Sequence, residues 1–483
     1  MDGSLISEAS SILETDDLFD FAASRATVYR NQLGDGSVRP SGSTATIRKS
    51  FELPTPEHPG DPSEIIESLA AAAEPGLMGM ASPRFFGWVI GASHPVGVAA
   101  DMMTSAWGQN AAMSYATPAA AFAEKAAGAW LLDLLDLPRE SSVGFVTGAT
   151  MANFVCLAAL RTKLFARMGW DVEEDGLFGA PDIRILIGED AHASVYAALQ
   201  YLGFGRRRAK QIASDAQGRM IPTALRAELE SEDTPAIVIS QAGQINTGAI
   251  DPFVDIVPVC KEYGALLHVD GAFGLWARAC QDRAHLADGI DGADSWATDG
   301  HKWLQVPYDS GFAIVRDQSA HRAAMSICAS YLIEETEAYN PKDYVPELSR
   351  RARGFAAWAV IQALGRSGID AMISRHCCLA RLVANRLRRE PGIFIPNAVT
   401  LNQVMVDFDL PNSADRAGDV RAIVDHVQTF GGVFVETVEW HRRPVLRISI
   451  TSGDTSEADI EALQTAIIDA WRQSEHHPSN QTN

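Results

Sequence analysis

The stretch DPFVDIVPVCKEYGALLHVDG, residues 251–271, contains a helical pattern that leads into a short apolar run ending at Asp270. The same rhythm extends in both directions, with helical stretches such as MANFVCLAALRTKLFARM (151–168) between short apolar runs. These runs are VGFVTG (143–148), DIRILIG (182–188), PAIVIS (235–240), LLHVDG (266–271), SWAT (295–298) and GFAIV (311–315). Such alternation predicts an α/β domain, in which a mostly parallel central sheet is covered by helices on both faces.

The domain boundaries follow from changes in pattern along the chain. We assign the large α/β domain to residues 80–345. Residues 1–79 include a stretch rich in Gly, Pro and Ser and are predicted to form an N-terminal extension with helices. Strand-like runs and a closing helical pattern predict a small C-terminal α+β domain over 346–474. The polar residues 475–483 are predicted to be disordered.

Composition and charge restrict the class of protein. The chain has 483 residues, and 47% of them are hydrophobic, which is ordinary for a globular protein. Its net charge of −21 disfavours nucleic acid as a partner, because phosphate backbones repel it. We find no apolar run of about 20 residues and no signal peptide, so we predict no membrane span. The six cysteines form no metal-binding pattern, so we predict a cytoplasmic protein without a metal.

Candidate functional residues follow the apolar runs, since ligands of open parallel sheets bind at the carboxyl ends of the strands. TGATMAN (147–153) opens a helix, and a helix N-terminus favours binding of an anion such as phosphate. The Thr150 hydroxyl could donate a further hydrogen bond to that anion. His192 follows the run RILIG, where a histidine can be functional, a neighbour of a helix cap or a packed ring.

Asp270 and Lys302 make the strongest pair. A carboxylate at the end of an apolar run needs a cationic partner, and a protonated pyridine nitrogen is one. Ala272 lies on the same side of an extended chain and is small enough to lie under a flat ring. Lys302 follows at an interval that fits one helix and one strand, and a lysine partly removed from water can act as a nucleophile. Lysine, carboxylate and helix N-terminus together match the demands of pyridoxal 5′-phosphate (PLP).

Several motifs resemble the group II PLP-dependent amino acid decarboxylases, which include the aromatic amino acid, glutamate and histidine decarboxylases. These motifs are SPRFFGW (82–88), EDAHASV (189–195), HVDGAFG (268–274), DGHKWLQVPYDSG (299–311) and PELSRRARGFAAW (346–358). The resemblance implies a fold-type I, aspartate-aminotransferase-like architecture and a homodimer that the N-terminal extension would contact. It also implies PLP held as an aldimine by Lys302, followed by a quinonoid on the path to the amine and CO₂.

The resemblance assigns further roles to single residues. Asp270 would pair with the pyridinium nitrogen, His192 would stack on the ring, and Ala272 would touch the opposite ring face. Ala149, Thr150 and His301 would lie near the phosphate. Tyr344 matches, across a gap, a tyrosine on the family's mobile loop that would reprotonate the substrate carbon; a plain surface aromatic is the alternative. Gln244 and Ile245 stand where the family usually has two threonines, which leaves a contact from that position open.

The predicted substrate is an amino acid, with an aromatic one favoured over glutamate. The rings near FFGW (85–88) suggest an apolar wall, to which we assign Trp88, Phe86 and His94, although core packing also explains these rings. The predicted activity is that of a PLP-dependent carboxy-lyase. The alternatives are an aldehyde synthase, a carbon–carbon lyase or a transaminase on the same scaffold and, more distantly, a non-catalytic PLP-binding protein.

Overall fold

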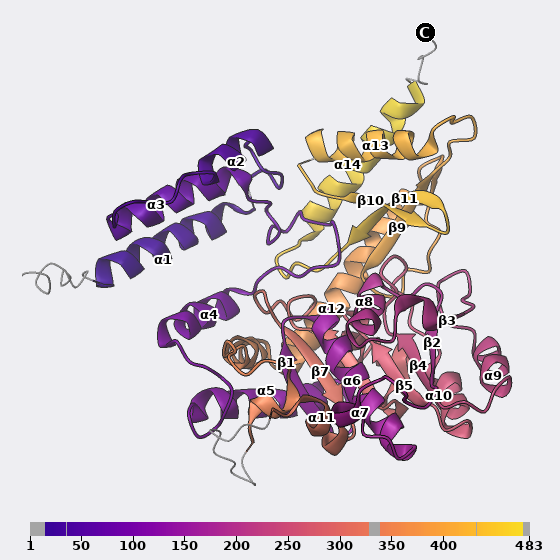
Figure 1. Cartoon of the computed structure of the whole chain (residues 1–483). Coiled ribbons are helices and arrows are strands. Elements are labelled where there is room, and N and C mark those ends of the chain that lie inside the picture. The colour runs from indigo at the N-terminus through magenta and orange to yellow at the C-terminus, as the bar shows by residue number, and fades with distance from the viewer. Residues whose placement is uncertain (1–14, 35, 328–338, 431, 477–483) are drawn as a thin grey trace, which may run out of the picture.

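The structure is a computed structural model that describes residues 15–34, 36–327, 339–430 and 432–476. A large sheet lies among helices in the body of the molecule, and a smaller sheet lies beside the C-terminal helices (Figure 1). The helices are α1 (Thr15–Gln32), α2 (Thr44–Phe51), α3 (Pro62–Ala73), α4 (Pro95–Trp107), α5 (Pro118–Leu134), α6 (Ala149–Arg167), α7 (Val172–Asp175), α8 (Ala193–Tyr201), α9 (Pro222–Glu230), α10 (Phe253–Glu262), α11 (Gln318–Met325), α12 (Gly354–Leu387), α13 (Arg416–Phe430) and α14 (Glu457–His476). Among the described residues, none of these helices has the length and apolar character to cross a membrane.

The large sheet has seven strands in the order β1-β7-β6-β5-β4-β2-β3. They are β1 (Ser142–Val146), β2 (Arg184–Gly188), β3 (Ala209–Ile212), β4 (Ala236–Gln241), β5 (Leu266–Asp270), β6 (Ser295–Asp299) and β7 (Gly311–Val315). The pairs from β3 across to β6 are parallel, whereas β7 runs antiparallel to both of its neighbours. The predicted mostly parallel α/β sheet is therefore confirmed, and the carboxyl ends of β1, β2, β4, β5 and β6 share one edge.

Helices bury both faces of this sheet, as the near-continuous apolar strands require. Successive strand residues alternate between two cores: Ile237 and Ile239 pack with α6 and α8, whereas Val238 packs on the opposite face with α5, α10 and α12. Because both faces are apolar, the sheet can bind a polar ligand only beyond the strand ends. The site must therefore form along that edge.

The small C-terminal sheet is antiparallel, in the order β10-β11-β9-β8. Its strands are β8 (Ile393–Phe394), β9 (Gln403–Phe408), β10 (Glu436–Trp440) and β11 (Arg443–Ser449). The predicted boundary at residue 345 lies just before α12, whose residues as far as Cys377 pack in the large-domain core. From Leu379 onward α12 packs in the small-domain core instead. One helix therefore serves both domains, which a change in sequence pattern does not reveal.

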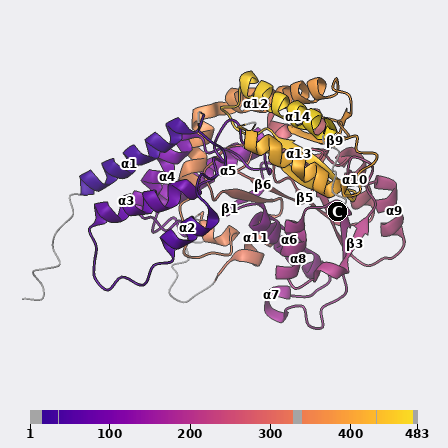
Figure 2. The same cartoon turned by 90° about the horizontal axis from the view of Figure 1, so that it is seen from above.

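The three N-terminal helices α1–α3 extend from one side of the body in both views (Figures 1 and 2). The chain then returns past the small domain, where the Phe86 N–H donates to the Phe434 carbonyl at 2.8 Å. It continues along the loop after β6, with the Gly91 N–H donating to the His301 carbonyl at 3.0 Å. A Cβ atom on Gly91 would lie 1.9 Å from the Lys302 carbonyl oxygen, so only glycine permits this close approach.

Candidate active site

The ends of β5 and β6 bring the predicted pair together. Asp270 is paired with Ala297 in the register of β5 and β6, and the Asp299 N–H donates to the Ala272 carbonyl at 3.0 Å. The interval between Asp270 and Lys302 differs from the predicted helix and strand. Before β6 it holds three short 3₁₀ segments, Gly274–Ala279, Ala284–Ala287 and Ile290–Gly292. Glycines and aspartates divide this interval, which prevents a continuous α-helix.

Lys302 lies in the loop after β6 and faces Asp299. Its Nζ is 3.0 Å from Asp299 Oδ2, and its side chain is 18% exposed. The Asp299 carboxylate is 2% exposed and accepts the Ala149 N–H through Oδ1 at 2.6 Å. The amine is thus partly removed from water, held beside a buried acid and still accessible, as a nucleophile requires.

Asp270 and His192 lie close enough to Lys302 for its positive charge to shift the pKa of each. Burial raises the pKa of Asp270, and the charges of His192 and Lys302 oppose that shift. Desolvation lowers the pKa of His192, and the positive charges of Lys302 and Arg447 lower it further. His192 also caps α8, because its Nδ1 accepts the Ser194 N–H at 3.2 Å. The two predicted alternatives for His192, a functional ring and a helix cap, are therefore compatible in one side chain.

The turn into α6 is the predicted phosphate end of the site, and it lies against Asp299 and His301. Ala149 begins the helix and Thr150 is exposed beside it. A Cβ atom on Gly148 would lie 2.9 Å from His301 Cε1, so the turn packs tightly against His301. The His301 ring stacks on the Tyr308 ring with 4.4 Å between centroids, and desolvation lowers the pKa of His301.

Two functional candidates were missed in the sequence. Asp299 ends β6 just as Asp270 ends β5, so the strand-end rule could have found it. Arg447 is buried on β11, forms an ion pair with Glu436 and donates to Asn246 Oδ1 at 3.1 Å. A lone arginine inside an alternating apolar strand was the available signal. Gln244, at the position that departs from the family, accepts the N–H groups of Asn246 and Thr247 and so stabilises its own turn.

Comparison with known proteins identifies the family. The model of the pyridoxal-dependent decarboxylase conserved domain matches residues 45–410. The chain belongs to the pyridoxal-dependent decarboxylase family. It is 25% identical to an aromatic-L-amino-acid decarboxylase of Bacillus atrophaeus over 90% of this chain and 91% of that protein. It is also 25% identical to a 4-hydroxyphenylacetaldehyde synthase of Rhodiola rosea, over 91% of each chain. The crystal structure of Oryza sativa TDC with PLP and tryptamine superposes with a TM-score of 0.88 at 21% identity, covering 96% of this chain and 99% of that one.

This pyridoxal-dependent decarboxylase is a fold-type I PLP enzyme and a carboxy-lyase, and its residues fit the cofactor. Lys302 would bind the aldehyde carbon, Asp270 the pyridine nitrogen, and the N-terminus of α6 the phosphate. The Thr298 and Ser310 hydroxyl groups are buried beside this loop without a hydrogen-bond partner in the described structure. No group of three or more His, Cys, Asp or Glu side chains is placed to hold a metal ion in the described part of the chain.

The three residues of the predicted substrate wall have different surroundings in the structure. Trp88 is 41% exposed, and its backbone N–H donates to Glu436 Oε1 at 2.8 Å, which connects its main chain to Arg447 and the His192 side of the site. Phe86 is 1% exposed and packs in the small-domain core, which leaves its ring little surface to offer a substrate. His94 caps α4, since its Nδ1 accepts the Val96 N–H at 3.3 Å. Its contact with substrate stays a prediction.

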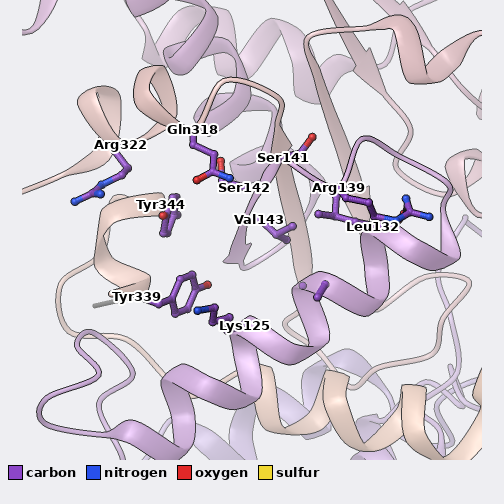
Figure 3. A pocket seen from close by; sticks show the side chains of 12 residues that line it. Lys125, Leu132, Arg139, Ser141, Ser142, Val143, Gln318, Arg322, Tyr339 and Tyr344 are labelled. Atoms are coloured by element: carbon purple, nitrogen blue, oxygen red, sulfur yellow. Dashed lines mark hydrogen bonds between the residues drawn. The ribbon is translucent and has the colours of Figure 1, made fainter. Parts of the chain in front are cut away.

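The structure does not bring Tyr344 to Lys302 within the chain. Tyr344 lines a separate pocket of about 400 Å³ together with Lys125, Ser142, Gln318 and Tyr339 (Figure 3). Its ring stacks on Tyr339 at 5.6 Å between centroids, and its carbonyl accepts the His321 Nε2–H at 3.0 Å. Packing of this short Pro341–Tyr344 segment against β1 explains the placement. A second tyrosine of this region, Tyr331, lies outside the described residues.

The variant Tyr344→Phe is expected to keep kcat/KM for decarboxylation within about twofold of wild type, because the lost hydroxyl lies away from Lys302. Steady-state CO₂ release and product analysis measure the effect. Tyr339→Phe, on the stacked ring, is the matched control. A large loss of amine together with a gain of aldehyde in Tyr344→Phe alone would place its hydroxyl at the reacting carbon after all.

Proposed function

We propose that this PLP-dependent decarboxylase acts on an aromatic L-amino acid and releases the corresponding amine and CO₂. The observation that supports an aromatic side chain is the state of Arg447, the cation on the His192 side. It is buried and neutralised by Glu436, so it is not free to bind a second substrate carboxylate. Trp88, whose backbone N–H donates to the same Glu436, is 41% exposed, and its ring lies against Phe85 and Phe434, so it offers an apolar surface instead. The aromatic amino acid decarboxylase relative is consistent with this choice.

The chain's own residues supply positioning and proton transfer. The Asp270 carboxylate would stabilise a protonated pyridine nitrogen, and the His192 ring would restrict the cofactor plane. Asp299 Oδ2 lies within hydrogen-bond reach of Lys302 Nζ, so a proton on the amine can be shared with it. When bound, PLP supplies the electron sink for the bond that breaks as CO₂ leaves. Burial of these groups keeps the leaving carboxylate poorly solvated.

A panel of L-amino acids tests the proposal. Tryptophan, tyrosine, phenylalanine, histidine, glutamate and aspartate are supplied to the purified enzyme, and CO₂, amine, aldehyde, ammonia and peroxide are measured. We expect the aromatic substrates to give kcat/KM values at least about tenfold above the acidic ones, since an unpaired buried carboxylate is costly. Faster turnover of glutamate or aspartate would contradict the aromatic assignment.

The second candidate is an aldehyde synthase on the same scaffold, which the Rhodiola rosea relative favours. The same panel distinguishes the two activities. Amine with equimolar CO₂ supports simple decarboxylation, whereas aldehyde, ammonia and peroxide support the oxidative route. A transaminase would require a keto-acid acceptor and release no CO₂.

We also propose a homodimer in the cytoplasm. Apolar side chains are exposed on the projecting helices and on the adjoining α4 and α5, which supports a second copy covering them. They are Phe19, Val28, Phe51, Ile65, Leu69, Met102, Met103, Trp107 and Phe122. The five described cysteines are free thiols, which supports a reducing compartment.

A further inference from the structure

The N-terminus of α6 already binds an anion from within the chain. Asp299 Oδ1 accepts the first helical N–H, that of Ala149, at 2.6 Å, and Oδ2 lies 3.0 Å from Lys302 Nζ. The same carboxylate therefore contacts both the phosphate end and the nucleophile of the cofactor site. At 2% exposure it is also shielded from solvent screening.

The packing around this carboxylate leaves it little space to turn away. A Cβ atom on Gly148 would lie 3.2 Å from Asp299 Oδ1, and one on Gly311 would lie 2.5 Å from Gly148 Cα. The turn before α6 is thus pressed against β7 on one side and against Asp299 on the other. Rotation of the carboxylate would break the bond to Ala149 as well as the ion pair with Lys302.

The positive charges around Asp299 are too few to neutralise both its carboxylate and a bound phosphate group. Lys302 and His301, whose Nε2 is 3.5 Å from Oδ1, are the described cationic side chains within ion-pair distance of it. Desolvation lowers the pKa of His301, which favours the neutral ring, and Asp270 adds a second acid to the site. A phosphate group bound at the N-terminus of α6 would therefore add a further negative charge near Asp299, where Lys302 is the charged amine. Asp299 already occupies the Ala149 N–H, and like charges repel strongly away from water.

We propose that Asp299 competes with the phosphate group of PLP for the N-terminus of α6 and so sets how tightly the enzyme retains its cofactor. Asp299 is thereby a residue that tunes cofactor affinity, separate from those that bind the pyridine ring. The proposal rests on the PLP dependence of the family and on no particular substrate. The aromatic assignment can fail without affecting it.

The test compares PLP with pyridoxal, which lacks the phosphate. Full-length wild type and Asp299→Asn are freed of cofactor and titrated with each compound, and visible absorbance and tryptophan fluorescence report binding. Asparagine keeps the shape and can still accept the Ala149 N–H, but it carries no charge. We expect the Kd for PLP to fall by about tenfold or more in the variant, and the Kd for pyridoxal to change by less than about threefold.

Asp294→Asn is the matched control, because Asp294 flanks the opposite end of β6. It accepts the Leu267 N–H at 3.0 Å and pairs with Lys163 at 3.4 Å, so like Asp299 it joins a backbone N–H to a lysine, but away from the cofactor site. An unchanged or weaker PLP affinity in Asp299→Asn overturns the proposal. Equal tightening of PLP and pyridoxal also overturns it, since the effect would then arise at Lys302. If Asp299→Asn fails to fold by circular dichroism, Asp299→Ser provides the same comparison.

Discussion

Replacing Lys302 with alanine is expected to lower kcat/KM for decarboxylation by about 10³-fold or more and to remove covalent attachment of PLP. The reason is geometric. Lys302 Nζ is the partly exposed amine beside Asp299, and its charge reaches both Asp270 and His192. Borohydride reduction of the loaded enzyme followed by peptide mapping should label Lys302 in wild type and nothing at that position in the variant.

Lys163→Ala is the control for this experiment. Lys163 is also partly buried and pairs with two acids, Asp294 and Asp317, but it lies at the far end of the sheet. The Lys163→Ala variant should retain both the borohydride label at Lys302 and the decarboxylase activity. Labelling of another lysine in wild type, or near-normal activity of Lys302→Ala, would remove the basis of the active-site assignment.

The variant Asp270→Asn is expected to lose about 10²–10³-fold in kcat/KM, the range typical of removing one preorganised electrostatic partner. An amide cannot hold the pyridine nitrogen protonated, so the cofactor withdraws electrons less well. The cofactor should still attach to Lys302, which the borohydride label reports. Rates for a preferred substrate, measured with saturating PLP, separate the catalytic loss from weaker binding.

Asp251→Asn serves as the control for Asp270→Asn, because Asp251 is a buried carboxylate outside the cofactor site. It accepts the N–H groups of Met220 and Gln241 at 2.8 Å each, and burial raises its pKa to about 7. The Asp251→Asn variant should change thermal stability rather than kcat. If Asp270→Asn retained full kcat, the pyridine nitrogen would have a different partner.

The sheet and its strand-end residues were predictable from the sequence because their signal is local. Each apolar run is short and continuous, and the residue that follows it must lie at the sheet edge, which locates Asp270, His192 and the turn at Ala149. The same rule applies to Asp299, which the structure shows at the end of β6. Its strand, SWATD, is less uniformly apolar than the others, so the sequence marks its last residue less clearly as a strand end.

The placements that are hardest to predict from the sequence depend on contacts between distant residues. Phe86 was assigned to the substrate wall because of its neighbours, yet the backbone bond to Phe434 directs its ring into the small-domain core. Tyr344 was matched across a gap, whereas packing against Tyr339 and His321 decides its place. A single sequence specifies residue types along the chain but not which of several aromatic side chains faces a given core.

The segment from Phe86 to His94 has a mechanical consequence for the enzyme. At one end it is hydrogen-bonded to the small domain through Phe434 and Ser449, and at the other its Gly91 packs against the Lys302 carbonyl. Too few residues separate these two anchors to absorb a hinge rotation. If the small domain rotates and these bonds are preserved, the peptide group of Lys302 must therefore move with it. Interdomain motion and the orientation of the Lys302 side chain are thus coupled.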